Sequence, residues 1–126
     1  MSRRALQPRE LAVPKAPYSP VVVSGTTVYT AGQVGFDEDG TLVEGGIEAQ
    51  TRQALDNVRA CLEAAGAGLA DVLKVTVFLA DLADFDAYNA VYGDVFEEPF
   101  PARTTVQAGL PGGILVEIEV VAQLPR

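Results

Sequence analysis

The sequence predicts an α+β domain in which two amphipathic helices pack on one face of a mixed β-sheet. Two observations carry this prediction. Apolar residues recur at three- and four-residue steps over residues 47–65 and 85–96, and short β-branched stretches precede, separate and follow them. A chain of 126 residues, 48% of them hydrophobic, suits a single domain, 1–126, with one core. Because both helices cover the same face, the other sheet face must meet solvent or a partner.

In the N-terminal part, residues 1–31, the sequence predicts an irregular segment followed by a hairpin. Residues 1–15 contain Pro8 and Pro14 and show no clear periodicity, so we expect an irregular lead-in. Strands are predicted at 20–24 and 27–31, and Gly25-Thr26 is a plausible hairpin turn between them.

The first helix is predicted over residues 47–65, and Gly66 is its natural C-terminal stop. A strand follows over 72–80, and the second helix over 85–96 has Asp84 as its candidate N-cap. Two last strands are predicted at 102–107 and 114–124. The inward stripe of the first helix is Ile47, Thr51, Ala54, Leu55, Val58, Leu62 and Ala65, and that of the second is Phe85, Tyr88, Tyr92 and Val95 or Phe96.

The final strand alternates between a plain core face and a mixed face. The core face is Val116, Ile118 and Val120, and the mixed face is Leu115, Glu117, Glu119 and Val121. The mixed face fits a solvated surface. It also fits an interface in which one carboxylate turns into a pocket, and the pattern alone leaves both interpretations open.

Composition excludes several classes of function. The net charge of −8 disfavours binding to a phosphate backbone, so no nucleic-acid partner is expected. With one cysteine and no histidine, the chain has neither an internal disulfide nor a Cys/His zinc site. Apolar runs are too short to span a bilayer or to form a signal peptide, so we expect a cytoplasmic protein without membrane contact. The glycines form no phosphate-binding loop, and no GxSxG motif is present.

Three side chains are candidates for chemistry. Arg103 follows a proline at the start of a short strand, where its guanidinium can bind a carboxylate through two parallel hydrogen bonds; a surface ion pair is the simpler interpretation. Glu117 can hold or deprotonate a water, but Glu119 fits equally well by pattern. Tyr18 can donate a hydrogen bond to a ligand or simply pack, and Asn89 lies in mid-helix, where an exposed amide is sufficient reason for it.

The sequence resembles the reactive-intermediate-deaminase (Rid/YjgF) family from about residue 16 to residue 123. The resemblance depends on short segments that follow one another in the family's order and spacing. They are Ala16-Pro17-Tyr18-Ser19-Pro20, Ala31-Gly32-Gln33, residues 46–55, residues 75–79, Asp84-Phe85 through Asn89 to Tyr92, Pro101-Ala102-Arg103 and Val116-Glu117-Ile118-Glu119.

This resemblance implies a chorismate-mutase-like fold that assembles as a homotrimer, with three pockets between subunits. It also implies hydrolysis of 2-iminobutanoate and 2-iminopropanoate to 2-keto acids and ammonia, without a metal or organic cofactor. By position, Arg103 matches the family's carboxylate-binding arginine and Glu117 matches the glutamate that activates water. Tyr18, Gly32 and Asn89 match residues that line the pocket.

Several positions depart from the family pattern near that pocket. Thr105 stands where many members have cysteine; its hydroxyl can still bind substrate, so a changed substrate preference is expected. Ala31 and Gly35 replace a common serine and proline, and the loops before Pro101 and after Val106 are slightly short. Two other functions stay open: a regulatory trimer that binds metabolites without turnover, and a deaminase of a larger conjugated substrate such as 2-aminomuconate. Glu117 separates catalysis from binding, because only hydrolysis requires it.

Overall fold

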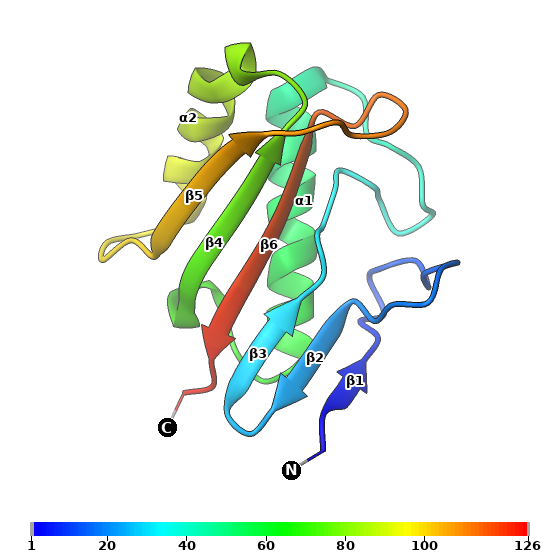
Figure 1. Ribbon diagram of the computed structural model, residues 1–126, viewed down its shortest axis with the longest axis vertical. Helices are drawn as coiled ribbons and strands as arrows, with labels where there is room; N and C mark the ends of the chain where they lie inside the picture. Colours follow the sequence, from blue (N-terminus) through cyan, green and yellow to red (C-terminus); the bar gives the residue numbers. More distant parts are fainter. Residues whose placement is uncertain (1, 126) are drawn as a thin grey trace.

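Six strands form one mixed sheet in the order β1-β2-β3-β6-β4-β5 in the computed structural model, which describes residues 2–125. Both α-helices lie on the same side of this sheet (Figure 1). The predicted α+β class and helix arrangement are therefore confirmed. The elements are β1 (Arg4–Leu6), β2 (Val21–Ser24), β3 (Thr27–Thr30), α1 (Gly46–Ala64), β4 (Val72–Leu79), α2 (Phe85–Val95), β5 (Ala102–Gln107) and β6 (Val116–Gln123).

The N-terminal hairpin forms as predicted, but the lead-in is not wholly irregular. Gly25 has a φ of 61° at the turn between β2 and β3, a conformation that glycine adopts without steric cost. The prediction of an irregular segment over residues 1–15 is wrong for β1, which pairs antiparallel with β2. This edge strand is held by backbone hydrogen bonds and is mostly exposed, so it has no apolar alternation that a sequence pattern could detect.

The first helix buries the centre of the predicted stripe, whereas Ile47 and Ala65 at its two ends are only half-buried. Thr51, Leu55 and Val58 are inaccessible to solvent, and the buried set also includes Gln50 and Asn57. Gly66 has a φ of 88°, and the N–H of Ala67 donates back to the Leu62 carbonyl, which ends the helix.

The second helix begins at Phe85 after a short 3₁₀ turn, Leu82–Asp84. Asp84 occupies the N-cap position but its side chain makes no capping hydrogen bond. Asp81 instead accepts from the N–H of Ala83 and caps the 3₁₀ turn. The N-cap prediction is therefore right in position and wrong in mechanism, because the extra turn moves the cap three residues upstream.

The central strands divide the sheet into a covered and an uncovered face. β6 lies between β3 and β4, antiparallel to both, while β5 is parallel to β4 across the α2 connection. Val116, Ile118 and Val120 are buried under the helices, which confirms the predicted core face. The mixed face of β6 is half-buried and no helix covers it. Within residues 2–125, no helix is both long and apolar enough to cross a membrane.

Candidate functional site

Arg103 lies on the covered face of the sheet, beside α2. On β5 it pairs with Val75 of the core, so its side chain points toward the helix layer. Its Nη1 donates to Asn89 Oδ1 at 2.8 Å. Three aromatic rings of α2 surround its Cζ, with centroids at 4.6 Å for Tyr92, 5.3 Å for Tyr88 and 5.7 Å for Phe85.

These contacts fix the plane of the guanidinium before any ligand arrives. The guanidinium makes cation–π contacts and one hydrogen bond, to Asn89. Its other N–H groups donate to none of the described residues and can form parallel hydrogen bonds to an anion. A cavity of about 360 Å³ opens beside it. Its walls are Asn89, Tyr92, Gly93, Phe100, Pro101 and Arg103. A cationic group beside apolar walls suits a small carboxylate with an apolar substituent.

Thr105 follows Arg103 on the same face of β5 and touches α2. Its register partner is Val77, which belongs to the core. The Thr105 Oγ1 and the Tyr88 hydroxyl are 2.7 Å apart. The first half-site thus comprises Arg103, Asn89 and Thr105, held by the aromatic residues of α2.

Glu117 lies on the other, uncovered face, next to Gly32. Its register partner on β4 is Phe78. A Cβ placed on Gly32 would come within 2.7 Å of Glu117 Cδ and 2.8 Å of its Cγ, so only glycine leaves room for the carboxylate in this position. The Gln33 N–H donates to the Ile118 carbonyl at 2.7 Å, and the Ile118 N–H donates back at 2.9 Å, which keeps the 31–34 segment against β6.

Glu117 also lines a cavity of about 240 Å³ that includes Tyr18 and Gly32. Burial raises the pKa of the Glu117 carboxyl, and the nearby charge of Glu119 raises it further. Glu119 pairs with Thr76 and is not among the residues that line this cavity. The structure therefore distinguishes two carboxylates that sequence periodicity treats as equivalent.

Within one chain, the predicted site residues form two separate groups. Tyr18, Gly32 and Glu117 line one cavity and form the second half-site. Arg103 and Asn89 line the other cavity, and Thr105 lies beside it on β5, in contact with Tyr88. Arg103 and Glu117 lie on opposite faces, and β4 separates their strands. Within residues 2–125, Arg103 and Glu117 therefore do not share a cavity.

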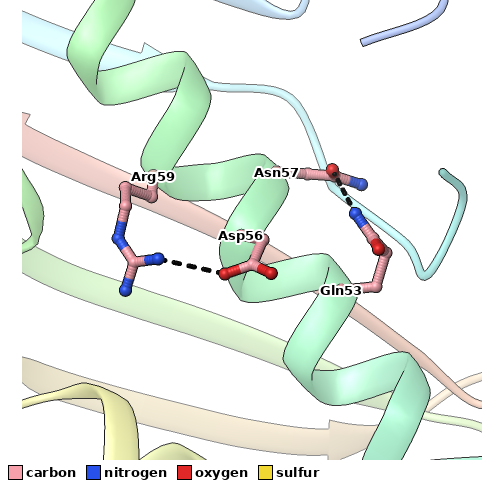
Figure 2. A network of polar contacts seen from close by, with 4 residues as sticks. All are labelled: Gln53, Asp56, Asn57 and Arg59. Atoms are coloured by element: carbon pink, nitrogen blue, oxygen red, sulfur yellow. Dashed lines mark hydrogen bonds and ion pairs between the residues drawn. The ribbon is translucent and has the colours of Figure 1, made fainter. Parts of the chain in front are cut away.

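Two buried amides of α1 fix the backbone near the second half-site. Asn57 Nδ2 donates to the carbonyls of Val34 and Phe36, at 3.0 and 2.9 Å, and its Oδ1 accepts from Gln53 (Figure 2). Gln50 donates to the Gly113 carbonyl at 3.1 Å and accepts from the Leu115 N–H at 2.8 Å. The two amides therefore hold the segments that precede α1 and β6.

The sequence did not reveal these supports or the aromatic residues around Arg103. Phe85, Tyr88 and Tyr92 were expected as plain core residues, although their spacing along one helix face was visible. Their contact with Arg103 depends on how α2 docks on β5. Cys61 is buried, and burial raises its pKa to about 12, so it stays an unreactive thiol. Across residues 2–125, no cluster of three or more Cys, His, Asp or Glu side chains could hold a metal.

Comparisons with known proteins give a consistent result. The family model described as endoribonuclease L-PSP matches residues 9–124. The human protein named 2-iminobutanoate/2-iminopropanoate deaminase is 45% identical over 108 residues, which cover 84% of this chain and 79% of the human one. A RutC family protein of Pyrococcus horikoshii is 47% identical over 111 residues, covering 86% and 88% of the two chains.

Solved structures agree over almost the whole length. The crystal structure of RidA from an Antarctic Psychrobacter superposes with a TM-score of 0.91 at 41% identity, covering 96% of this chain and 99% of that one. The YjgF gene product of E. coli gives a TM-score of 0.89 at 37% identity, with 95% and 98% covered.

Proposed function

The chain belongs to the endoribonuclease L-PSP family, which includes the RidA and YjgF proteins it resembles, and on that premise we propose that it hydrolyses reactive 2-imino acids to 2-keto acids and ammonia. Relatives in goat and human, 43% and 45% identical, carry the name of that activity. The observation that carries the proposal is the place of the Glu117 carboxylate, which is held against Gly32 in a cavity. Burial there raises the pKa of this carboxyl group. A binding module needs Arg103 alone, whereas hydrolysis also needs a base.

Arg103 is the proposed anchor for the substrate. Its free N–H groups bind the carboxylate of the imino acid in two parallel hydrogen bonds, and Asn89 and the rings of α2 keep it in place. Anchoring the carboxylate also fixes the position of the imine carbon, because that carbon is bonded directly to the carboxylate. The apolar walls at Phe100 and Pro101 favour small apolar substituents.

Glu117 is the proposed general base. It accepts a proton from a water as the water oxygen bonds to the imine carbon and the C=N electron pair moves to nitrogen. The proton then passes to that nitrogen and gives an aminoalcohol. Its hydroxyl proton moves to the amine, the C–N bond breaks, and ammonia leaves as the carbonyl forms. One imine and one water give one keto acid and one ammonia, so the reaction consumes no cofactor. The raised pKa makes Glu117 a stronger base than an exposed carboxylate.

The opposite-face placement of Arg103 and Glu117 favours a site shared between subunits. We infer that Arg103, on the edge strand β5 of one subunit, faces Glu117 of its neighbour in a homotrimer that buries the uncovered sheet faces. The half-buried side chains of this face, including Phe78 and Val121, supply apolar area for such contact. Light scattering at micromolar concentration tests this: a stable monomer would contradict both the trimer and the shared site.

A mixed-variant experiment tests the sharing directly. Arg103→Ala and Glu117→Gln proteins, each expected to have little activity alone, are mixed under conditions that let subunits exchange. A site built from two subunits regains part of the activity, because some interfaces carry intact Arg103 and Glu117 together. If each site lay within one chain, mixing would restore nothing.

The reaction itself is tested with imines generated in place. An amino-acid oxidase supplies 2-imino acids from several amino acids, and their decay is followed with and without the protein. Faster decay of small apolar imines supports the proposal. Acceleration confined to a larger conjugated substrate such as 2-aminomuconate would show that the protein is a deaminase of that class and not of small imino acids. No acceleration, with pyruvate still binding at Arg103, would favour a regulatory module.

The family description also names an endoribonuclease. The net charge of −8 opposes binding to an RNA backbone, so we propose no nucleic-acid partner for this chain. Incubation with a labelled RNA is the appropriate control in the same assay.

A further inference from the structure

Tyr88 connects α2 with both site residues of β5. The side chain is completely inaccessible to solvent, and among the described residues its hydroxyl has one hydrogen-bond partner, Thr105 Oγ1 at 2.7 Å. Its ring centroid is 5.3 Å from Arg103 Cζ. A single buried residue therefore contacts the anchor and the neighbouring hydroxyl at the same time.

The direction of this hydrogen bond follows from burial. A phenol has one proton, and leaving a buried donor without an acceptor is costly. If Thr105 donated, the phenol proton would have no acceptor, so Tyr88 must donate to Thr105 Oγ1. Burial raises the pKa of Tyr88, an effect larger than the opposing effects of Thr105 and Arg103, so the donor keeps its proton.

The hydrogen bond from Tyr88 also orients the hydroxyl of Thr105. A threonine hydroxyl has one proton and two lone pairs, and Tyr88 occupies one lone pair. The Thr105 proton therefore points away from Tyr88 and has no acceptor among the described residues. Thr105 is half-buried and shares a face with Arg103 two residues away, so this proton lies on the side of the sheet where the anchor lies.

We propose that Tyr88 is a positioning residue that makes Thr105 a hydrogen-bond donor to the carboxylate bound by Arg103. This inference rests on the proposed function, because it adds a third contact to the same anion. It gives a role to the position at which this chain departs from the cysteine of many family members.

The test is a double-mutant cycle with pyruvate as the probe, measured by calorimetry. Tyr88→Phe removes only the hydroxyl and keeps the ring against Arg103. Its dissociation constant for pyruvate is expected to rise about 3- to 10-fold, as for loss of one oriented hydrogen bond. In a Thr105→Val background the same change is expected to have no effect, whereas in a Thr105→Ser background the full effect returns.

The cycle separates positioning from a general loss of packing. Tyr29→Phe makes the same chemical change on β3, three strands from β5 and on the uncovered face beside Val121. It serves as the matched control, with light scattering to show that its oligomeric state is that of the unmodified protein. An unchanged pyruvate constant in Tyr88→Phe, or an equal effect with and without the Thr105 hydroxyl, would overturn the inference while imine turnover by the unmodified protein still supported the proposed function. An unmodified protein that neither binds pyruvate nor turns over imines would overturn both.

Discussion

Replacing Gly32 by alanine tests whether the exact place of the Glu117 carboxylate matters for turnover. The added Cβ would come within 2.7 Å of Glu117 Cδ, whereas ordinary contact begins near 3.4 Å. The glutamate side chain must therefore move by at least roughly 0.7 Å, the difference between these two distances, because its Oε2 lies closer still to the added Cβ. Displacing a catalytic group by about 1 Å costs on the order of 10²-fold in rate. We expect Gly32→Ala to lower kcat by about 10- to 100-fold.

Folding stability should change little in the same variant. Gly32 is not among the glycines with positive φ, so alanine can adopt its backbone conformation. The group that must yield is the end of a flexible side chain, not a backbone atom. The expected pattern is a loss of activity with a nearly unchanged urea midpoint.

Two other glycines provide matched controls for the same substitution. A Cβ on Gly35 would lie 2.9 Å from Gln50 Cα, a backbone atom of α1, so Gly35→Ala should lower stability by about 1–3 kcal/mol. A Cβ on Gly109 meets nothing within 4 Å, so Gly109→Ala should leave both stability and turnover near normal.

Imine decay measures turnover, and urea unfolding measures stability, for all three variants. In a Glu117→Ala background, Gly32→Ala should cause no further loss, because the displaced group is gone. Full turnover by Gly32→Ala would refute the assigned place of the carboxylate. An equal loss with and without Glu117 would show that the alanine acts through something else.

The remaining predictions concern the candidate site residues and the neighbouring Tyr92. Arg103→Lys should restore little of the activity that Arg103→Ala loses, because an ammonium cannot form two parallel hydrogen bonds in one plane; near-normal turnover in the imine assay would contradict the anchor. Glu117→Gln should lower turnover by about 10²-fold or more while pyruvate binding by calorimetry survives, and Glu119→Gln should do much less. The base must be deprotonated to act, and the pKa of Glu117 is raised. On acidification, kcat/KM should therefore begin to fall at a higher pH than an ordinary glutamate base would give. Glu119→Gln should move this fall to lower pH. Finally, Tyr92→Phe removes a buried hydroxyl that has no hydrogen-bond partner among residues 2–125, so unfolding in urea should show stability unchanged or raised by about 1 kcal/mol.

The sequence predicted those helices and strands whose burial on one side leaves a periodic pattern within the element itself. The stripe of α1 and the alternation of β6 reflect burial on one side of one element, which the periodicity of that element records. The three-residue strand β1 escaped prediction because its support is backbone pairing at an edge, which leaves no side-chain pattern.

Candidate site residues could be proposed from the sequence, but their arrangement could not. Arg103 and Glu117 each follow from residue type and from the family resemblance, yet their opposite faces depend on the register of β5 and β6 against β4. The pairing of Tyr88 with Thr105 joins a helix to a strand across 17 residues, so neither element alone contains it.

The amide of Gln50 links the dynamics of a loop to those of a helix. The Leu115 N–H donates to Gln50 Oε1 at 2.8 Å rather than to a neighbouring strand. Its exchange with deuterated solvent therefore requires release from α1, and not merely fraying at the start of β6. Gln50 lies inside the 19-residue helix, so its release should accompany opening of the core. The protection factor of the Leu115 amide should therefore match those of the central α1 amides and exceed those of the surrounding loop.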